Sequence, residues 1–143
     1  MTGDPMEILL VEDNPAHAEM TVRALRKNNV SNHIRVARDG AEAVNFLFAN
    51  GTAPTGSPKL ILLDLKLPKL DGIEVLRRIK ADPRTKMIPV VMLTSSNEDH
   101  DLKACYGLGV NSYIVKPVDF QQFSDAVRSL GLYWVLLNRL PNG

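Results

Sequence analysis

The sequence has very little of several features that mark particular protein classes. It contains one cysteine, Cys105, so no disulfide can form within the chain, and a reducing, cytoplasmic setting is the simplest interpretation. The formal net charge is only +1, and no long basic or acidic run argues for nucleic-acid binding. No apolar stretch approaches the roughly 20 residues of a membrane helix. Residues 1–5 are polar and too short for a signal peptide, so we expect no membrane or targeting segment.

What the sequence does contain is typical of one globular domain. Its 143 residues are 45% apolar and 23% charged, enough to bury a core, and show no internal repeat. The predicted strands are Met6–Val11, His33–Ala37, Leu60–Leu63, Ile88–Leu93 and Ser112–Val115. The predicted helices are Pro15 to about Asn29, Ala41–Ala49, Ile73–Ala81, Glu98–Leu108 and Phe120 to about Asn138. This alternation predicts an α/β fold, a doubly wound parallel sheet with helices on both faces.

One predicted strand ends in a carboxylate. Four apolar residues, Leu60–Leu63, run without a break and stop at Asp64. Such a run next to turn residues is typical of a strand that is buried on both faces of a parallel sheet. Open α/β sheets place their ligand sites at the C-terminal ends of such strands. Because an unpaired buried charge is costly, Asp64 needs a partner at this end.

Polar and charged residues also follow the other strands. Glu12 and Asp13 follow the first strand, Thr94 ends the fourth, and Lys116 follows the fifth. Since the ends of parallel strands share one edge, these residues should converge on Asp64. Three clustered carboxylates are tolerable when a hard cation such as Mg²⁺ lies among them. Asp64 can then act as a nucleophile toward a phosphoryl group whose oxygens contact Lys116 and Thr94.

Most of these residues also have an ordinary structural interpretation. A lone aspartate at a strand end more often shapes a loop or caps a helix, and Asp64 differs only through its companions. Asp71-Gly72 is interpreted as the start of a helix and not as part of the chemistry. The three histidines, His17, His33 and His100, lack the spacing of metal ligands. They are predicted to be surface or edge residues, and none resembles a phosphate donor.

The order of the motifs resembles that of a response-regulator receiver domain, the family of the bacterial chemotaxis regulator. The resemblance covers about residues 6–130 and is carried by Glu12-Asp13, Asp64 with Pro68 and Asp71-Gly72, Thr94, and Tyr113-Ile114-Val115-Lys116-Pro117. It implies a single receiver domain over 1–143, extended by a C-terminal helix or tail at about 119–140. It also implies a flavodoxin-like sheet of strand order 2-1-3-4-5 with five helices.

The resemblance implies a role in a two-component phosphorelay. Asp64 accepts a phosphoryl group from the phosphohistidine of a sensor histidine kinase, and Lys116 pairs with the phosphate. The implied ligands of Mg²⁺ are Glu12, Asp13, Asp64 and the backbone carbonyl of Lys66. The implied switch residues are Thr94 and Tyr113. We therefore expect a cytoplasmic signalling protein and not an enzyme, with no substrate beyond phosphodonors, whose output passes through protein contacts or onward along a relay.

Two segments resemble more specifically the stand-alone regulators that partner phytochrome-type kinases, which would make a bacteriophytochrome the kinase partner. They are the loop 50–58 and the tail 131–138. The predicted last helix carries a core-facing stripe at Val127, Leu130, Trp134 and Leu137, and it has further apolar residues on its other sides. A helix that is apolar nearly all round should be buried nearly all round. This favours a homodimer through the C-terminal helix, and the alternative is a tail that covers the loop 50–58 of its own chain.

Two other functions fit part of the pattern. A magnesium-dependent phosphohydrolase or mutase also forms an aspartyl-phosphate, but such enzymes generally have an acid two residues after the nucleophile, where this chain has Lys66. A receiver-like fold that is never phosphorylated conflicts with the complete set of site residues. Lys66 and Ser96 lie two residues beyond Asp64 and Thr94 and border the phosphoryl group in this family. Lys66 is therefore predicted to alter the lifetime of the phosphorylated form.

Overall fold

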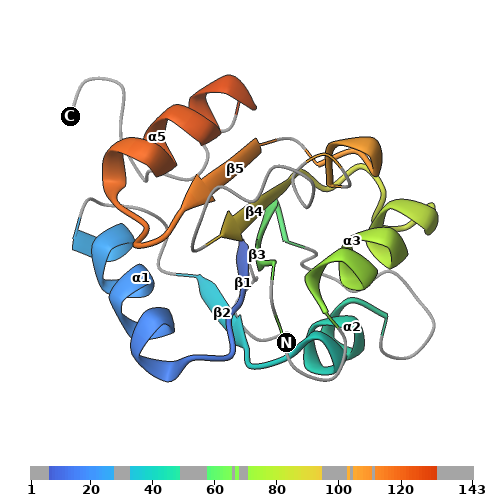
Figure 1. Ribbon diagram of the computed structural model, residues 1–143, viewed down its shortest axis with the longest axis horizontal. Helices are drawn as coiled ribbons and strands as arrows, with labels where there is room; N and C mark the ends of the chain where they lie inside the picture. The colour runs from blue at the N-terminus through green and yellow to red at the C-terminus, as the bar shows by residue number, and fades with distance from the viewer. Residues whose placement is uncertain are drawn as a thin grey trace, which may run out of the picture.

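The structure is a computed structural model that describes residues 7–27, 33–48, 58–65, 67, 71–94, 103, 105–110 and 112–131. Strands and helices alternate along this part of the chain (Figure 1). The strands are β1 (Ile8–Val11), β2 (Ile34–Ala37), β3 (Leu60–Asp64), β4 (Val90–Thr94) and β5 (Ser112–Val115). The helices are α1 (Pro15–Lys27), α2 (Gly40–Phe48), α3 (Gly72–Ala81) and α5 (Phe120–Ser129). Residues 103 and 105–107 are also helical and lie where the fourth predicted helix was expected.

The five strands form one parallel sheet in the order β2-β1-β3-β4-β5. This order confirms the predicted flavodoxin-like fold. The register brings the strand ends together, because Val11 of β1 lies opposite Leu63 of β3, and Asp64 lies opposite Leu93 of β4. Residues that follow β1, β3 and β5 therefore meet at one edge of the sheet. Within the described residues no helix is both long and apolar enough to cross a membrane.

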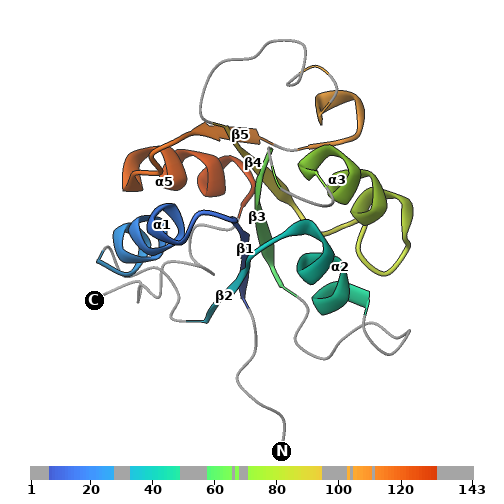
Figure 2. The ribbon, with the colours of Figure 1, turned by 60° about the horizontal axis from the view of Figure 1, so that its bottom comes forward.

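Helices cover both faces of the sheet (Figure 2). Helices α1 and α5 lie on one face, while α2 and α3 lie on the other. Side chains alternate between the two layers, so Ile8 and Leu10 of β1 pack in the α1/α5 layer, and Leu9 and Val11 pack in the α2/α3 layer. All residues of β1 and β3 are buried. A strand that is covered on both faces needs apolar residues at every position, which explains the unbroken run before Asp64.

The helix α5 ends earlier than the sequence predicted. Its last residue is Ser129, and the backbone N–H of Leu130 donates to Ala126 O and Val127 O at the helix end. Gly131 then has a φ of 75°, a left-handed conformation that is typical of glycine just after a helix. The prediction that this helix continues from Phe120 to about residue 138 is therefore wrong at Gly131, while Trp134 and Leu137 of the predicted apolar stripe lie outside the described residues. The tail 132–143 lies outside the described residues.

The start of α3 is tied to the end of β3. Asp71 caps α3, and its Oδ1 accepts a hydrogen bond from the backbone N–H of Glu74 at 3.0 Å, which agrees with the predicted helix start. Gly72 has a second role. Its N–H donates to Leu65 O at 3.1 Å, and a Cβ at this position would lie 2.7 Å from Leu65 O and against the carbonyl oxygen of Asp64. A hydrogen atom is thus the only side chain that fits here.

We expect Gly72→Ala to lower the free energy of unfolding by about 1–3 kcal/mol, because backbone atoms next to Asp64 must move to admit the methyl group. Gly107→Ala is the matched control. Gly107 is helical, and nothing lies within 4 Å of its would-be Cβ, so alanine should leave stability unchanged or raise it by up to about 1 kcal/mol. Urea unfolding of both variants measures the difference, and equal stabilities would contradict the packing argument.

Candidate functional site

Three carboxylates lie together at the C-terminal edge of the sheet. Glu12 and Asp13 follow β1, and Asp64 is the last residue of β3. One carboxylate oxygen from each lies within 4.8 Å of the others. Glu12 and Asp64 are buried at 1% and 5% exposure, whereas Asp13 is exposed. The structure thus brings together the three acidic residues that the sequence assigned to one metal site, and two of them are charges held away from bulk solvent.

Lys116 supplies the positive charge that offsets this cluster. Its Nζ donates to Glu12 Oε1 at 2.8 Å and to Asp64 Oδ2 at 3.0 Å. The backbone N–H of Lys116 also donates to Thr94 O at 2.7 Å, which fixes the residue at the end of β4. Breaking a buried ion pair leaves an uncompensated charge, and this usually costs much more than the intact pair contributes. The three side chains therefore act as one unit.

The pKa shifts follow from this arrangement. Burial raises the pKa of the Glu12 carboxyl, and the nearby Asp64 raises it further, while the hydrogen bond from Lys116 opposes both effects. Burial lowers the pKa of the Lys116 ammonium, but its hydrogen bonds to Glu12 and Asp64 outweigh burial and leave that pKa raised. The Lys116 ammonium thus stays charged at neutral pH. Burial thus makes ionisation of Glu12 harder than that of an ordinary glutamate in water.

The cluster fits a hard divalent cation. The carboxylates of Glu12, Asp13 and Asp64 provide only oxygen donors, and their oxygens are close enough to share one ion. Mg²⁺ prefers such ligands and keeps several waters, so a site with one exposed residue suits it. A cation bound there would oppose the effect of burial on Glu12, because a nearby positive charge favours the ionised carboxylate.

The other predicted site residues lie around this cluster or outside the described residues. Thr94 is the buried last residue of β4, and its backbone carbonyl accepts the Lys116 N–H. Tyr113 lies on β5 and points outward, 38% exposed, with its ring edge-on to Tyr106 at a centroid distance of 6.4 Å. Lys66 and Ser96 fall outside the part of the chain that the structure describes.

His17 is a site neighbour that the sequence did not identify. It was predicted to be a surface residue, and it is exposed. However, its Nδ1 lies 3.3 Å from Lys116 Nζ. The two residues are 99 positions apart, so no local pattern indicates the contact. The structure explains the contact by the position of His17, which lies four residues after Asp13 on the first turn of α1.

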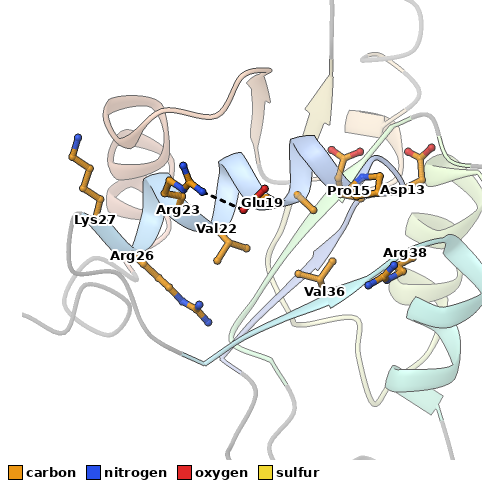
Figure 3. Close-up of a pocket in the computed structure, with 11 residues that line it drawn as sticks. Asp13, Pro15, Glu19, Val22, Arg23, Arg26, Lys27, Val36 and Arg38 are labelled. Carbon is orange, nitrogen blue, oxygen red and sulfur yellow. Dashed lines mark hydrogen bonds and ion pairs between the residues drawn. The ribbon is translucent and has the colours of Figure 1, made fainter.

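The acidic cluster opens on one side into a groove of about 730 Å³ between α1 and β2 (Figure 3). Asp13 and Arg38 lie at one end of this groove, and Arg26 and Lys27 lie at the other. Apolar side chains, including Val22 of α1 and Val36 of β2, line its middle. The edge strand β2 is thus covered only partly by α1, and the cluster can be reached from solvent at Asp13.

Comparison with known proteins matches this chain to response regulators. A family model described as the response regulator receiver domain matches residues 8–128. The probable methanogenesis regulatory protein FilR2 of Methanothrix harundinacea is 44% identical over 138 residues, which cover 96% of this chain and 89% of FilR2. The response regulator Rcp1 of Synechocystis sp. is 39% identical over 141 residues, which cover 98% of this chain and 96% of Rcp1.

Solved structures show the same fold. The bacteriophytochrome response regulator AtBRR superimposes with a TM-score of 0.82 at 51% identity, covering 96% of this chain and 100% of AtBRR. The Mn²⁺-bound form of Rcp1 gives a TM-score of 0.70 at 38% identity and covers 95% of this chain and 97% of Rcp1. The phosphorylated cyanobacterial phytochrome response regulator RcpA gives 0.71 at 40% identity and covers 96% of this chain and 99% of RcpA.

Proposed function

The chain belongs to the response regulator receiver domain family, and on this premise we propose that it is a signalling module controlled by phosphorylation of Asp64. One observation carries the proposal. The Asp64 carboxylate ends a buried strand beside two further carboxylates and 3.0 Å from the Lys116 ammonium. This is the arrangement that an aspartyl-phosphate site requires, namely an anionic nucleophile, oxygen ligands for a cation and a fixed positive charge.

The chemical step is a phosphoryl transfer. A carboxylate oxygen of Asp64 attacks the phosphorus of a phosphohistidine, the new O–P bond forms, and the N–P bond breaks. The leaving imidazole nitrogen keeps the electron pair of that bond and takes up a proton. Lys116 places its ammonium where charge collects on the phosphoryl oxygens, and the Thr94 hydroxyl contacts another oxygen. Little covalent chemistry is required of the protein beyond positioning.

We assign the cation site to Glu12, Asp13 and Asp64, with the backbone carbonyl of Lys66 as a further ligand. Receiver domains bind a divalent metal, and one of the structures similar to this chain is a Mn²⁺-bound form. Mg²⁺ is proposed as the ion because the donors are all oxygens. When bound, it supplies neutralisation of the charge that accumulates during phosphoryl transfer. The proposed effect of Lys66 on the lifetime of the phosphorylated form stays a prediction.

The phosphodonor is proposed to be a sensor histidine kinase. Receiver domains of response regulators interact with such kinases, and several similar structures are phytochrome-linked regulators, so a bacteriophytochrome kinase fits best. A groove of about 310 Å³ between α1 and the segment after β5 lies beside Lys116. Met20, 55% exposed, lines it. The groove lies beside the proposed phosphoryl site, and we propose that Met20 gives the kinase an apolar contact there.

The output is proposed to pass from Thr94 to Tyr113. Phosphorylation adds about −1.5 to −2 charge at Asp64, and the Thr94 hydroxyl is expected to move toward that charge. Space beside β5 then opens for Tyr113, which points outward and contacts Tyr106 in this structure. The outer surface around the two tyrosines changes shape, and a partner that binds one shape better reads the signal. This is a signalling role, and we propose no catalytic turnover of a small molecule.

The phosphorylation proposal is tested by incubating the protein with acetyl phosphate and Mg²⁺ and measuring its intact mass. We expect uptake of one phosphoryl group, no uptake without a divalent cation, and loss of uptake in Asp64→Asn. Asp119→Asn is the matched control, because that side chain caps α5 and lies outside the cluster. Steady hydrolysis of a small phosphate ester would instead indicate a phosphohydrolase. Absence of uptake under all conditions would indicate a receiver-like fold that is not phosphorylated.

For the switch, we expect Thr94→Ala to retain phosphorylation by acetyl phosphate while the response at Tyr113 is weakened. The reason is that the alanine methyl group cannot hydrogen bond to the phosphoryl oxygens. Methyl or amide NMR signals near β5, compared with and without phosphodonor, report that response. A Thr94→Ala variant whose Tyr113 signals shift as far as those of the original protein would contradict the coupling.

We also propose a homodimer through the C-terminal region, on the basis of the apolar residues of the tail 132–138. Sedimentation velocity over a concentration series should show a dimer, and deletion of residues 132–143 should give a monomer with unchanged phosphorylation. A chain that is monomeric at every concentration would favour the alternative, in which the tail covers the loop 50–58 of its own chain. Location in the cytoplasm stays a prediction.

A further inference from the structure

A closed ring of polar contacts joins the acidic cluster to the first turn of α1. Lys116 Nζ donates to Glu12 Oε1 at 2.8 Å, and the same Nζ lies 3.3 Å from His17 Nδ1. The backbone N–H of His17 donates to Asn14 Oδ1 at 3.1 Å. The backbone N–H of Asn14 donates to Glu12 Oε2 at 3.1 Å, which returns the ring to its starting residue.

The hydrogen-bond donors of Lys116 bear on the contact with His17. An ammonium carries three N–H donors and no acceptor. The Lys116 ammonium has three neighbours in hydrogen-bonding range, which are Glu12 Oε1, Asp64 Oδ2 and His17 Nδ1. The contact with His17 is a hydrogen bond only if Nδ1 is unprotonated and accepts. The imidazole is then the neutral form with its proton on Nε2, and every donor of Lys116 is used.

The ring also explains why an exposed histidine can hold a defined position. The side chain of Asn14 caps α1 by accepting from the backbone N–H groups of Ala16 and His17, at 2.9 and 3.1 Å. The backbone N–H of Asn14 also donates a hydrogen bond to Oε2 of Glu12. The loop after β1 therefore fixes Glu12 and the first turn of α1 relative to each other. His17 faces Lys116 because of this cap.

We propose that His17 is a positioning residue that holds the Lys116 ammonium over Asp64 during phosphoryl transfer. This inference rests on the proposed role of Asp64 as the phosphoryl acceptor. When a phosphoryl group arrives at Asp64, the ammonium must exchange its bond to the Asp64 carboxylate for one to a phosphoryl oxygen. Glu12 and His17 are the two acceptors that hold the ammonium in place during this exchange. Water can replace the imidazole nitrogen as an acceptor, but it is not anchored to α1.

The kinetic test compares His17→Ala with His17→Asn. Alanine removes the acceptor, whereas asparagine places an oxygen near the position of Nδ1 and cannot become charged. We expect His17→Ala to lower the rate of phosphorylation at saturating acetyl phosphate roughly three- to tenfold, the range for an ordinary hydrogen bond, because water can partly replace the imidazole at this exposed site. The concentration of donor for half-maximal rate should stay unchanged, and His17→Asn should restore the rate to within about twofold.

Glu19→Gln serves as the matched control, because Glu19 is exposed on the same helix and pairs with Arg23 instead of Lys116. Its phosphorylation rate should equal that of the original protein. Equal rates for His17→Ala and the original protein would overturn the positioning role and leave the proposed function intact. A lower rate that His17→Asn does not restore would also overturn it, because the loss would then come from altered packing of α1.

A second readout needs neither metal nor phosphodonor. Long-range ¹H–¹⁵N correlation spectra at pH 8 distinguish the two neutral forms of an imidazole. We expect His17 to have an unprotonated Nδ1 and a proton on Nε2, and we expect this preference to be lost in Lys116→Met. A proton on Nδ1 of His17 in the original protein would overturn the inference. Failure of the original protein to take up phosphate would contradict the proposed function, and the spectra would still decide whether His17 accepts from Lys116.

Discussion

The structure depends on one constraint, which is the placement of two buried carboxylates beside a single ammonium. Glu12 and Asp64 are almost fully buried, and two like charges so close would repel strongly in a medium of low dielectric constant. Lys116 makes the arrangement possible by donating to both. Because this compensation is partial, burial and the Asp64 charge still raise the pKa of Glu12. Lys116 thus offsets part of the negative charge of the cluster and does not remove the effect of burial on Glu12.

The sheet brings these charges together by its register. Leu63 lies opposite Val11, so Asp64 and Glu12 each follow a paired position on adjacent strands. Lys116 arrives from β5, two strands away from β3, and its backbone bond to Thr94 fixes it to the end of β4. Gly72 allows the start of α3 to pack directly against the backbone at the end of β3, because only a glycine fits against the Asp64 carbonyl. Each of these contacts is made by backbone atoms, so the site is built into the fold and does not depend on loop side chains alone.

Much of this could be predicted from the sequence, and the limits have physical reasons. The apolar runs that stop at charged residues predicted the strands, and parallel topology then placed Glu12, Asp64 and Lys116 at one edge. The second role of Gly72 was missed, because the sequence assigned Asp71-Gly72 only to the start of a helix, and the close approach of α3 to the Asp64 carbonyl exists only in the folded chain. The end of α5 was missed since the apolar pattern continues past Gly131, although the glycine itself was a stop signal. The contact of His17 arises only from the three-dimensional fold, because its partner is 99 residues away.

The proposed phosphorylation of Asp64 requires an exchange of hydrogen-bond partners at Lys116 and not simple addition of a new partner. All three donors of the Lys116 ammonium have an acceptor within range, so a phosphoryl oxygen can be bound only if one existing partner is given up. Lys116 is also bonded through its backbone to Thr94, the residue at the end of β4. A change of partner at the ammonium therefore acts on the same short segment that joins β4 to β5. An ammonium with three possible acceptors in range has discrete alternative arrangements, and on the proposed function a charge at Asp64 shifts the population among them.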